Sequence, residues 1–143
     1  MRSKGQSSVE LLVTIGVALL MFLITISLVY TMLNSSTRDS EIRRASVSVS
    51  SLVSSIKAVY YTPGSNIYLE TSLPDSLETF TIQSFGPNSE STLVKAKLSD
   101  GNEIIEYVAA KVSYNGDITS GGNYLFNISN SNGTVVVDVI TRG

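Results

Sequence analysis

The chain has 143 residues, with no cysteine, no histidine and a formal net charge of −2. A chain without cysteine has no disulfide framework and no thiolate zinc site. The ten basic residues form no cluster on one element, so nucleic-acid binding is not expected. This length allows one modest domain and an anchor.

An uncharged apolar run extends from Leu11 to Leu33. As a helix of ~1.5 Å per residue it is about 35 Å long, enough to cross a hydrocarbon core of ~30 Å. It exceeds the roughly 7–15 apolar residues of a secretory signal peptide, and no small-residue cleavage site follows it. Arg2 and Lys4 precede it, which predicts a cytoplasmic N-terminus with the rest of the chain outside. By itself, this apolar run predicts an uncleaved signal anchor.

The residues before the run, KGQSSVEL, are more specific than an anchor needs. They closely resemble the class III signal peptide of archaeal type IV pilins. In that family a short basic leader ends in glycine, cleavage falls before a glutamine, and a Q-x-S-x-E pattern enters the hydrophobic helix. Here Lys4 and Gly5 end the leader, and Gln6, Ser8 and Glu10 fill the pattern.

The resemblance implies a structural protein, cleaved between Gly5 and Gln6 so that residues 1–5 are a leader peptide. The mature chain would then polymerise into an extracellular filament for adhesion or surface attachment. The implied partners are other copies of the chain, a prepilin peptidase, an assembly ATPase with its membrane platform, and the membrane before assembly. A minor pilin or pseudopilin that primes or tips a filament fits the same motif. A membrane-anchored surface binding protein that never polymerises is the alternative from another class.

Glu10 is an acid at the edge of the apolar run, where a carboxylate is costly and is a functional candidate. Cleavage after Gly5 would create an amine on Gln6, about one helical turn away in the same subunit or near Glu10 of a staggered neighbour. Pairing with that amine offsets the cost of burying the charge. The alternative is a solvated Glu10 at the level of the lipid headgroups. We expect pairing in a filament whose dry core is built from the apolar run, with Leu20 in its interior.

After the apolar run, a second helical pattern is expected, although ASVSVSS within it alternates like a strand. Apolar residues recur at spacings of 3 and 4, a stripe that continues on both sides of ASVSVSS and therefore favours helix. This stripe consists of Ile42, Ala45, Val49, Leu52, Ile56 and Val59. We interpret it as the face that packs on the C-terminal part of the chain.

Thr62-Pro63 predicts the end of this helix, because proline disfavours helical geometry at the residue before it. The sequence therefore predicts one helix over residues 6–62, of which 11–33 is the transmembrane segment or fibre core. Its charged collar is interpreted as a solvated face and consists of Arg38, Asp39, Glu41, Arg43 and Arg44.

Residues 63–143 are expected to form a β-rich head, which makes the fold class α+β. Strand-like runs lie at 67–73, 78–85, 92–98, 103–114, 124–129 and 134–140. Hairpin turns are predicted at Asp100-Gly101, Asn115-Gly116 and Asn132-Gly133. We expect five to seven short antiparallel strands wrapped on the second half of the helix.

The sequence contains no recognisable catalytic set, and we expect neither an enzyme nor a cofactor. Asp100, Asp117 and Asp138 are scattered and lack the spacing of a calcium loop. No glycine-rich phosphate-binding loop is present, and no metal site is expected.

Three N-x-S/T sequons begin at Asn34, Asn127 and Asn132. Such tripeptides also arise by chance in a chain rich in serine and asparagine. The last two lie in or beside the final predicted hairpin, where modification of an exported protein is feasible. Asn34 abuts the membrane and is the least accessible of the three. For Asn132 the alternative is a turn asparagine that tolerates left-handed geometry.

Overall fold

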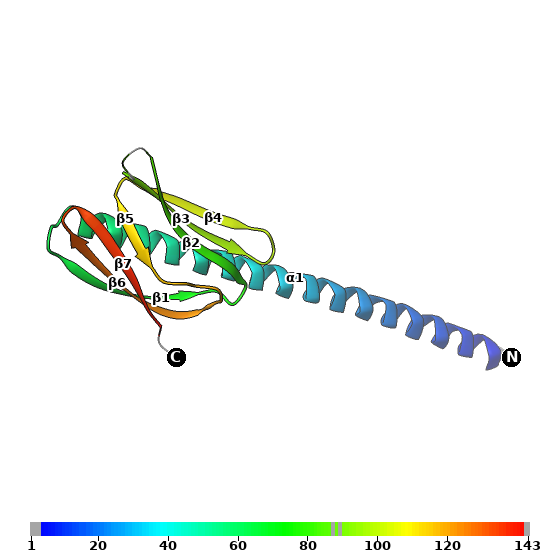
Figure 1. Ribbon diagram of the computed structural model, residues 1–143. Helices are drawn as coiled ribbons and strands as arrows, with labels where there is room; N and C mark the ends of the chain where they lie inside the picture. Colours follow the sequence, from blue (N-terminus) through cyan, green and yellow to red (C-terminus); the bar gives the residue numbers. More distant parts are fainter. Residues whose placement is uncertain (1–3, 87, 89, 142–143) are drawn as a thin grey trace. The chain divides into compact units, whose positions relative to one another are not determined.

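A computed structural model describes residues 4–86, 88 and 90–141, and it confirms an α+β fold with a C-terminal β-domain packed on a long helix (Figure 1). The elements are α1 (Lys4–Tyr60), β1 (Asn66–Leu73), β2 (Leu77–Phe85), β3 (Ser91–Leu98), β4 (Glu103–Val108), β5 (Val112–Asn115), β6 (Gly122–Ser131) and β7 (Thr134–Thr141). The chain divides into two compact units, Met1–Asp39 and Ser40–Gly143. The part of α1 from Ser40 onward therefore belongs to the same unit as the strands.

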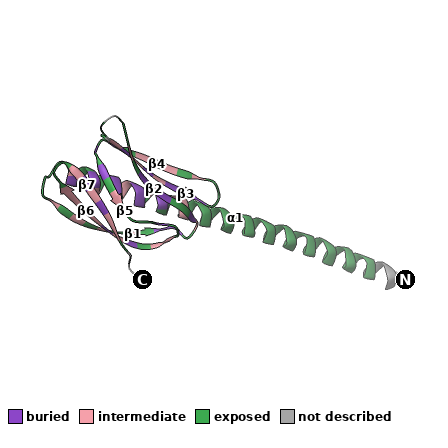
Figure 2. Ribbon diagram, in the orientation of Figure 1, coloured by how far each residue is buried: buried purple, intermediate pink, exposed green. Residues whose placement is uncertain are grey.

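The predicted apolar stripe of α1 is confirmed as part of the head's core. Ala45, Val49 and Ile56 are fully buried, and Leu52 and Val59 are buried beside them. Ile42, at the start of the stripe, is partly buried against the same cluster. Figure 2 shows the buried residues of α1 gathered where the strands surround it. Helical spacing of 3 and 4 places these side chains on one face, which explains why one stripe is covered.

The strands form two sheets that share this core. The first has the order β1-β6-β7-β5 and the second the order β2-β3-β4. Phe80 of β2 and Phe126 of β6 bring the two sheets together, with ring centroids 6.3 Å apart. Alternation of buried and exposed residues along β3 and β6 matches the period-two pattern of half-buried strands.

The expectation of antiparallel pairing throughout is wrong for one pair. All other strand pairs are antiparallel, but β5 pairs in parallel with β7, with Val112 opposite Val135. Accordingly, Asn115-Gly116 does not close a hairpin. The chain leaves β5 there and runs through an irregular segment, in which Ile118 is buried, before β6 begins.

The run 103–114 was expected as one strand and is in fact two strands in different sheets. Pairing of β4 with β3 stops at Val108, and β5 begins at Val112 in the other sheet. Val108, Ala110 and Val112 are all buried, so inward alternation continues across the break. The alternation of apolar residues indicates which face of a strand is buried in the core. That face stays the same where the chain leaves one sheet and enters the other, so the sequence does not reveal the break.

Two hydroxyl groups hold this crossover between the sheets. The Thr92 hydroxyl is fully buried and donates to the Ala110 carbonyl at 2.8 Å. The Ser84 hydroxyl lies 2.9 Å from the Thr92 hydroxyl and 2.7 Å from the Val112 carbonyl, to which it donates. These bonds satisfy backbone groups that leave the ladder at the crossover, where an unpaired buried carbonyl would be costly.

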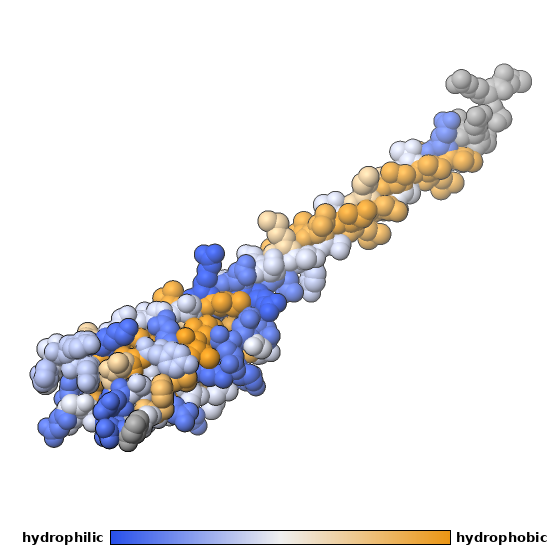
Figure 3. All heavy atoms as spheres, turned by 90° about the horizontal axis from the view of Figure 1, so that it is seen from above, coloured by the Kyte–Doolittle hydropathy of each residue, from blue (hydrophilic) through white to orange (hydrophobic). Residues whose placement is uncertain are grey.

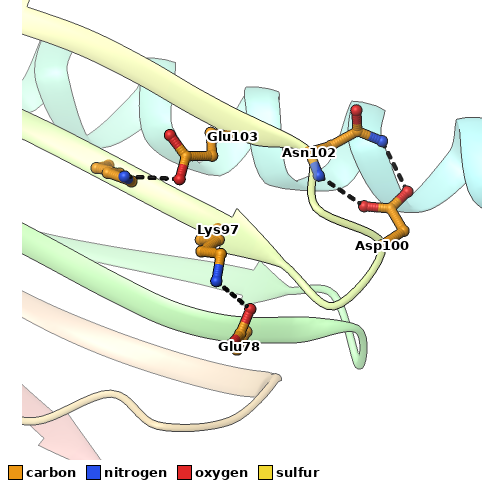
Figure 4. Close-up of polar contacts among 6 residues, drawn as sticks. Glu78, Lys97, Asp100, Asn102 and Glu103 are labelled. Atoms are coloured by element: carbon orange, nitrogen blue, oxygen red, sulfur yellow. Dashed lines mark hydrogen bonds and ion pairs between the residues drawn. The ribbon is translucent and has the colours of Figure 1, made fainter.

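The other two predicted hairpin turns are confirmed. Gly101 has a φ of 85°, and the Asp100 carboxylate accepts from both the backbone and the side-chain amide of Asn102, as Figure 4 shows. Asn132 and Gly133 have φ values of 52° and 81° between the paired residues Ser131 and Thr134. Two central residues with positive φ are typical of the type I′ turn that joins twisted strands.

Ion pairs lie on the outward face of the three-stranded sheet. Lys97 contacts Glu78 at 2.8 Å and Lys95 contacts Glu103 at 2.7 Å, with both pairs partly exposed (Figure 4). The Glu78 carboxylate raises the pKa of Lys97 through a hydrogen bond and its charge. Exposed pairs of this kind contribute little to stability. The positive charges of Lys95 and Lys97 are therefore each balanced by a neighbouring carboxylate.

Asn130, which the sequence did not single out, caps the C-terminal end of α1. Its side-chain amide donates to the carbonyls of Val59 and Tyr60 at 3.1 and 3.2 Å, in the last turn of the helix, where carbonyls lack α-helical partners. The Val59 carbonyl also accepts from the Thr62 amide. Its side-chain oxygen accepts from the Gly133 amide at 3.1 Å. One side chain therefore fixes the helix end against the turn between β6 and β7.

Asn130→Ala is predicted to lower the free energy of unfolding of the head by about 1–2 kcal/mol, because the Tyr60 carbonyl and the Gly133 amide lose the side chain that they bond to. The measurement is urea denaturation of the detergent-solubilised chain followed by tyrosine fluorescence. Asn123→Ala, at an exposed position of the same strand, is the control and should change little. Equal stability of the two variants would contradict the capping role.

Candidate functional site

The N-terminal part of α1 presents an apolar surface on every side of the helix. From Ser8 to Ser40 each described residue is exposed, including Leu11, Leu20 and Leu33. Figure 3 shows apolar side chains along this segment. The helix is long and apolar enough to span a membrane. An apolar surface of this extent needs lipid or other protein around it, since water does not solvate it favourably.

The threonine hydroxyls of this segment are satisfied within the helix itself. Each of four threonines donates to the backbone carbonyl four residues earlier, at 2.8–3.0 Å: Thr14, Thr25, Thr31 and Thr37. Such back-bonding leaves these four threonine donors without a need for water. They can therefore be buried in lipid or among other helices without loss of their partners. Sequence analysis did not predict these bonds, although threonine within a helix signals them.

The predicted processing residues lie at the start of α1. Lys4, Gly5 and Gln6 have helical backbone, and their side chains lie outside the described part of the structure. Ser8 and Glu10 are exposed. The Glu10 carboxylate makes no hydrogen bond or ion pair with the side chains described from residue 8 onward, while its backbone carbonyl accepts from Thr14. Leu20 is 57% exposed, at the middle of the apolar surface.

The three sequons lie in different surroundings. Asn34 is exposed within α1. Asn127 lies in β6 between Tyr68 of β1 and Asp138 of β7, and its side-chain oxygen is buried without a partner among the described residues. Asn132 is exposed at the tip of the β6–β7 hairpin. Accessibility therefore favours Asn132, which also has the left-handed geometry of a turn asparagine.

The titratable groups of the head include scattered acids and a partly buried phenol, that of Tyr114. Within residues 4–86, 88 and 90–141, no three His, Cys, Asp or Glu side chains are grouped to hold a metal ion. Burial, with smaller effects from Asp117 and Tyr124, raises the pKa of Tyr114 to about 12. This phenol therefore stays protonated at neutral pH. Asp100, Asp117 and Asp138 lie in three separate places: a turn, a loop and β7.

Comparison with protein-family models, with curated proteins and with solved structures found no match to this chain. The function of the chain is therefore inferred from its own residues and from the resemblance of its N-terminal motif.

We predict that Asn132 carries the N-linked glycan if the chain is modified in its own cells, because its amide is at an exposed hairpin tip. Mass spectrometry of peptides from the native protein measures this. Thr134→Val removes the sequon while keeping Asn132 in the turn, and should remove the added mass. Asn127→Gln is the matched control and should leave it unchanged. A glycan on Asn127 or Asn34 with none on Asn132 would contradict the prediction.

Proposed function

We propose that the chain is a type IV pilin precursor, a structural subunit that is inserted in the membrane, cut between Gly5 and Gln6 and polymerised into an extracellular filament. The motif of Lys4, Gly5, Gln6, Ser8 and Glu10 supports this proposal through its resemblance to the class III signal peptide. In this proposal the subunit's partners are other copies of itself, a prepilin peptidase, and an assembly ATPase with its membrane platform. Adhesion or surface attachment would be the task of the filament.

The observation that carries the proposal is the exposed apolar helix segment of residues 11–33, with its threonine hydroxyls satisfied internally. A lone anchor needs apolar residues that match lipid, and this segment meets that need. A fibre subunit must in addition leave lipid and pack against copies of itself, which favours a segment whose threonine donors are already satisfied. The core of the head includes only the later part of α1, whereas the described residues from Ser8 to Ser40 are exposed.

Gly5→Val is predicted to leave the precursor uncut and the cell surface without filaments. A peptidase must approach the backbone at the cut closely, and a β-branched side chain obstructs that approach. The measurement is the N-terminal residue and gel mobility of the membrane-bound chain, with Gln6 expected at the mature end of the parent. Gly16→Val is the control, because a Cβ at Gly16 meets nothing within 4 Å and cleavage should be normal. Cleavage of the Gly5→Val chain would overturn the assignment to this class of precursor.

Glu10→Gln is predicted to be inserted and cut normally but to polymerise poorly. The carboxylate would pair with the amine that cleavage creates on Gln6, and a loss of ~1.4 kcal/mol per contact is tenfold in an equilibrium constant. The measurement is filament yield relative to mature subunit in the membrane. Glu41→Gln, on the same helix but in the head unit, is the matched control and should assemble like the parent. A parental yield for Glu10→Gln would place Glu10 at headgroup level without a role in assembly.

A further inference from the structure

A groove of about 460 Å³ lies within the head unit, between the helix segment that begins at Ser40 and the end of strand β1. Its helix side includes Arg43, Arg44 and Ser51, and its strand side includes Thr71. Strand β1 is an edge strand of the four-stranded sheet, so its outer side is not covered by another strand. A groove of this size is within the range of small-ligand sites.

Helix periodicity explains why two neighbouring arginines line the same groove. Residues four apart lie on the same side of a helix, so Ser40, Arg44 and Ser48 form one row, and Arg43 and Ser51 belong to the adjacent row. Ser48 is a buried residue with an exposed fraction of 3%, and its hydroxyl donates to the Ser72 carbonyl at 3.0 Å. This bond joins helix and strand at the groove, so its two walls are fixed to each other.

The lining of this groove holds two cations and one acid. Within the described residues, neither Arg43 nor Arg44 makes an ion pair, whereas Lys95 and Lys97 of β3 are both paired. Glu70 is the one acidic residue of the lining, and it lies on β1. Two guanidinium groups against one carboxylate leave the groove with a positive charge. Sequence reasoning assigned both arginines to a solvated face and did not place them beside a strand.

The lining chemistry indicates the class of ligand. A guanidinium presents a planar fork of donors that matches the two oxygens of a carboxylate or phosphate. The hydroxyls of Ser40, Ser51 and Thr71 add groups that donate and accept, and Val47 is the one apolar side chain in the lining. An anionic molecule rich in hydroxyls would find partners for both kinds of group, while the carbon atoms of the lining can contact the ring faces of a sugar.

We propose that this groove binds an acidic saccharide, with its carboxylate between Arg43 and Arg44 and its hydroxyls against the serine and threonine side chains. The inference goes beyond the proposed function, since a head that binds acidic saccharide does so whether or not the chain polymerises. It assigns a ligand class to one surface of the head.

The test is binding of a fluorescent oligomer of glucuronic acid to the full chain in a polyoxyethylene detergent, which carries no sugar, measured by anisotropy. A neutral glucose oligomer of equal length should bind at least about tenfold more weakly, because hydrogen bonds to a charged group are the stronger ones. Arg43→Gln and Arg44→Gln should each weaken binding of the acidic oligomer about tenfold or more. Added salt should also weaken it.

Lys57→Gln is the matched control, an exposed cation on the same helix outside the groove, and it should leave binding unchanged. Arg43→Lys keeps the charge but not the fork, and should retain part of the affinity. Unchanged binding in both glutamine variants would overturn the proposal. So would equal binding of the neutral oligomer, or binding of anionic phospholipid vesicles by a chain that does not bind the acidic oligomer. Far-ultraviolet circular dichroism confirms that the variants are folded.

Discussion

The apolar stripe of α1 is the constraint on which the head depends. Its residues Ala45, Val49, Leu52, Ile56 and Val59 are buried in one core, to which the three-stranded and the four-stranded sheet both contribute. Sheets this small are marginal alone and need an apolar partner for their inner faces. The helix supplies that partner, so its second part is a structural element of the head. The compact unit accordingly begins at Ser40, well before the first strand.

Hydroxyl groups serve opposite purposes in the two units. In the apolar part of α1, threonines such as Thr25 bond to the backbone of their own helix, so these hydroxyls need no partner outside it. In the head, Thr92 and Ser84 bond to residues far away in the sequence and hold the crossover between sheets. A hydroxyl satisfied locally permits an element to be buried in different surroundings. A hydroxyl satisfied across elements fixes one arrangement of those elements.

This difference suits the two tasks proposed for the chain. A surface that exchanges lipid for neighbouring helices must be acceptable in both, and the apolar segment has uniform chemistry that depends on neither. A surface that selects a ligand must hold groups at fixed positions, and the groove beside β1 is built on a helix and a strand joined by Ser48 and Ser72. The uniform surface and the built groove belong to different compact units of one chain.

The sequence by itself determined what local periodicity and turn chemistry control. The 3–4 spacing from Ile42 to Val59, the turns at Asp100-Gly101 and Asn132-Gly133, and the exposed apolar helix are all readable there, because each depends on residues close together in the chain. The motif from Lys4 to Glu10 is likewise local. Only the tertiary structure decided the rest. It divides 103–114 into two strands and pairs β5 in parallel with β7. It also places Asn130 at the end of α1, and Arg43 and Thr71 in the lining of one groove. Each of these depends on which distant segment lies alongside, and alternation of apolar residues specifies the inward side of a strand but not its neighbour.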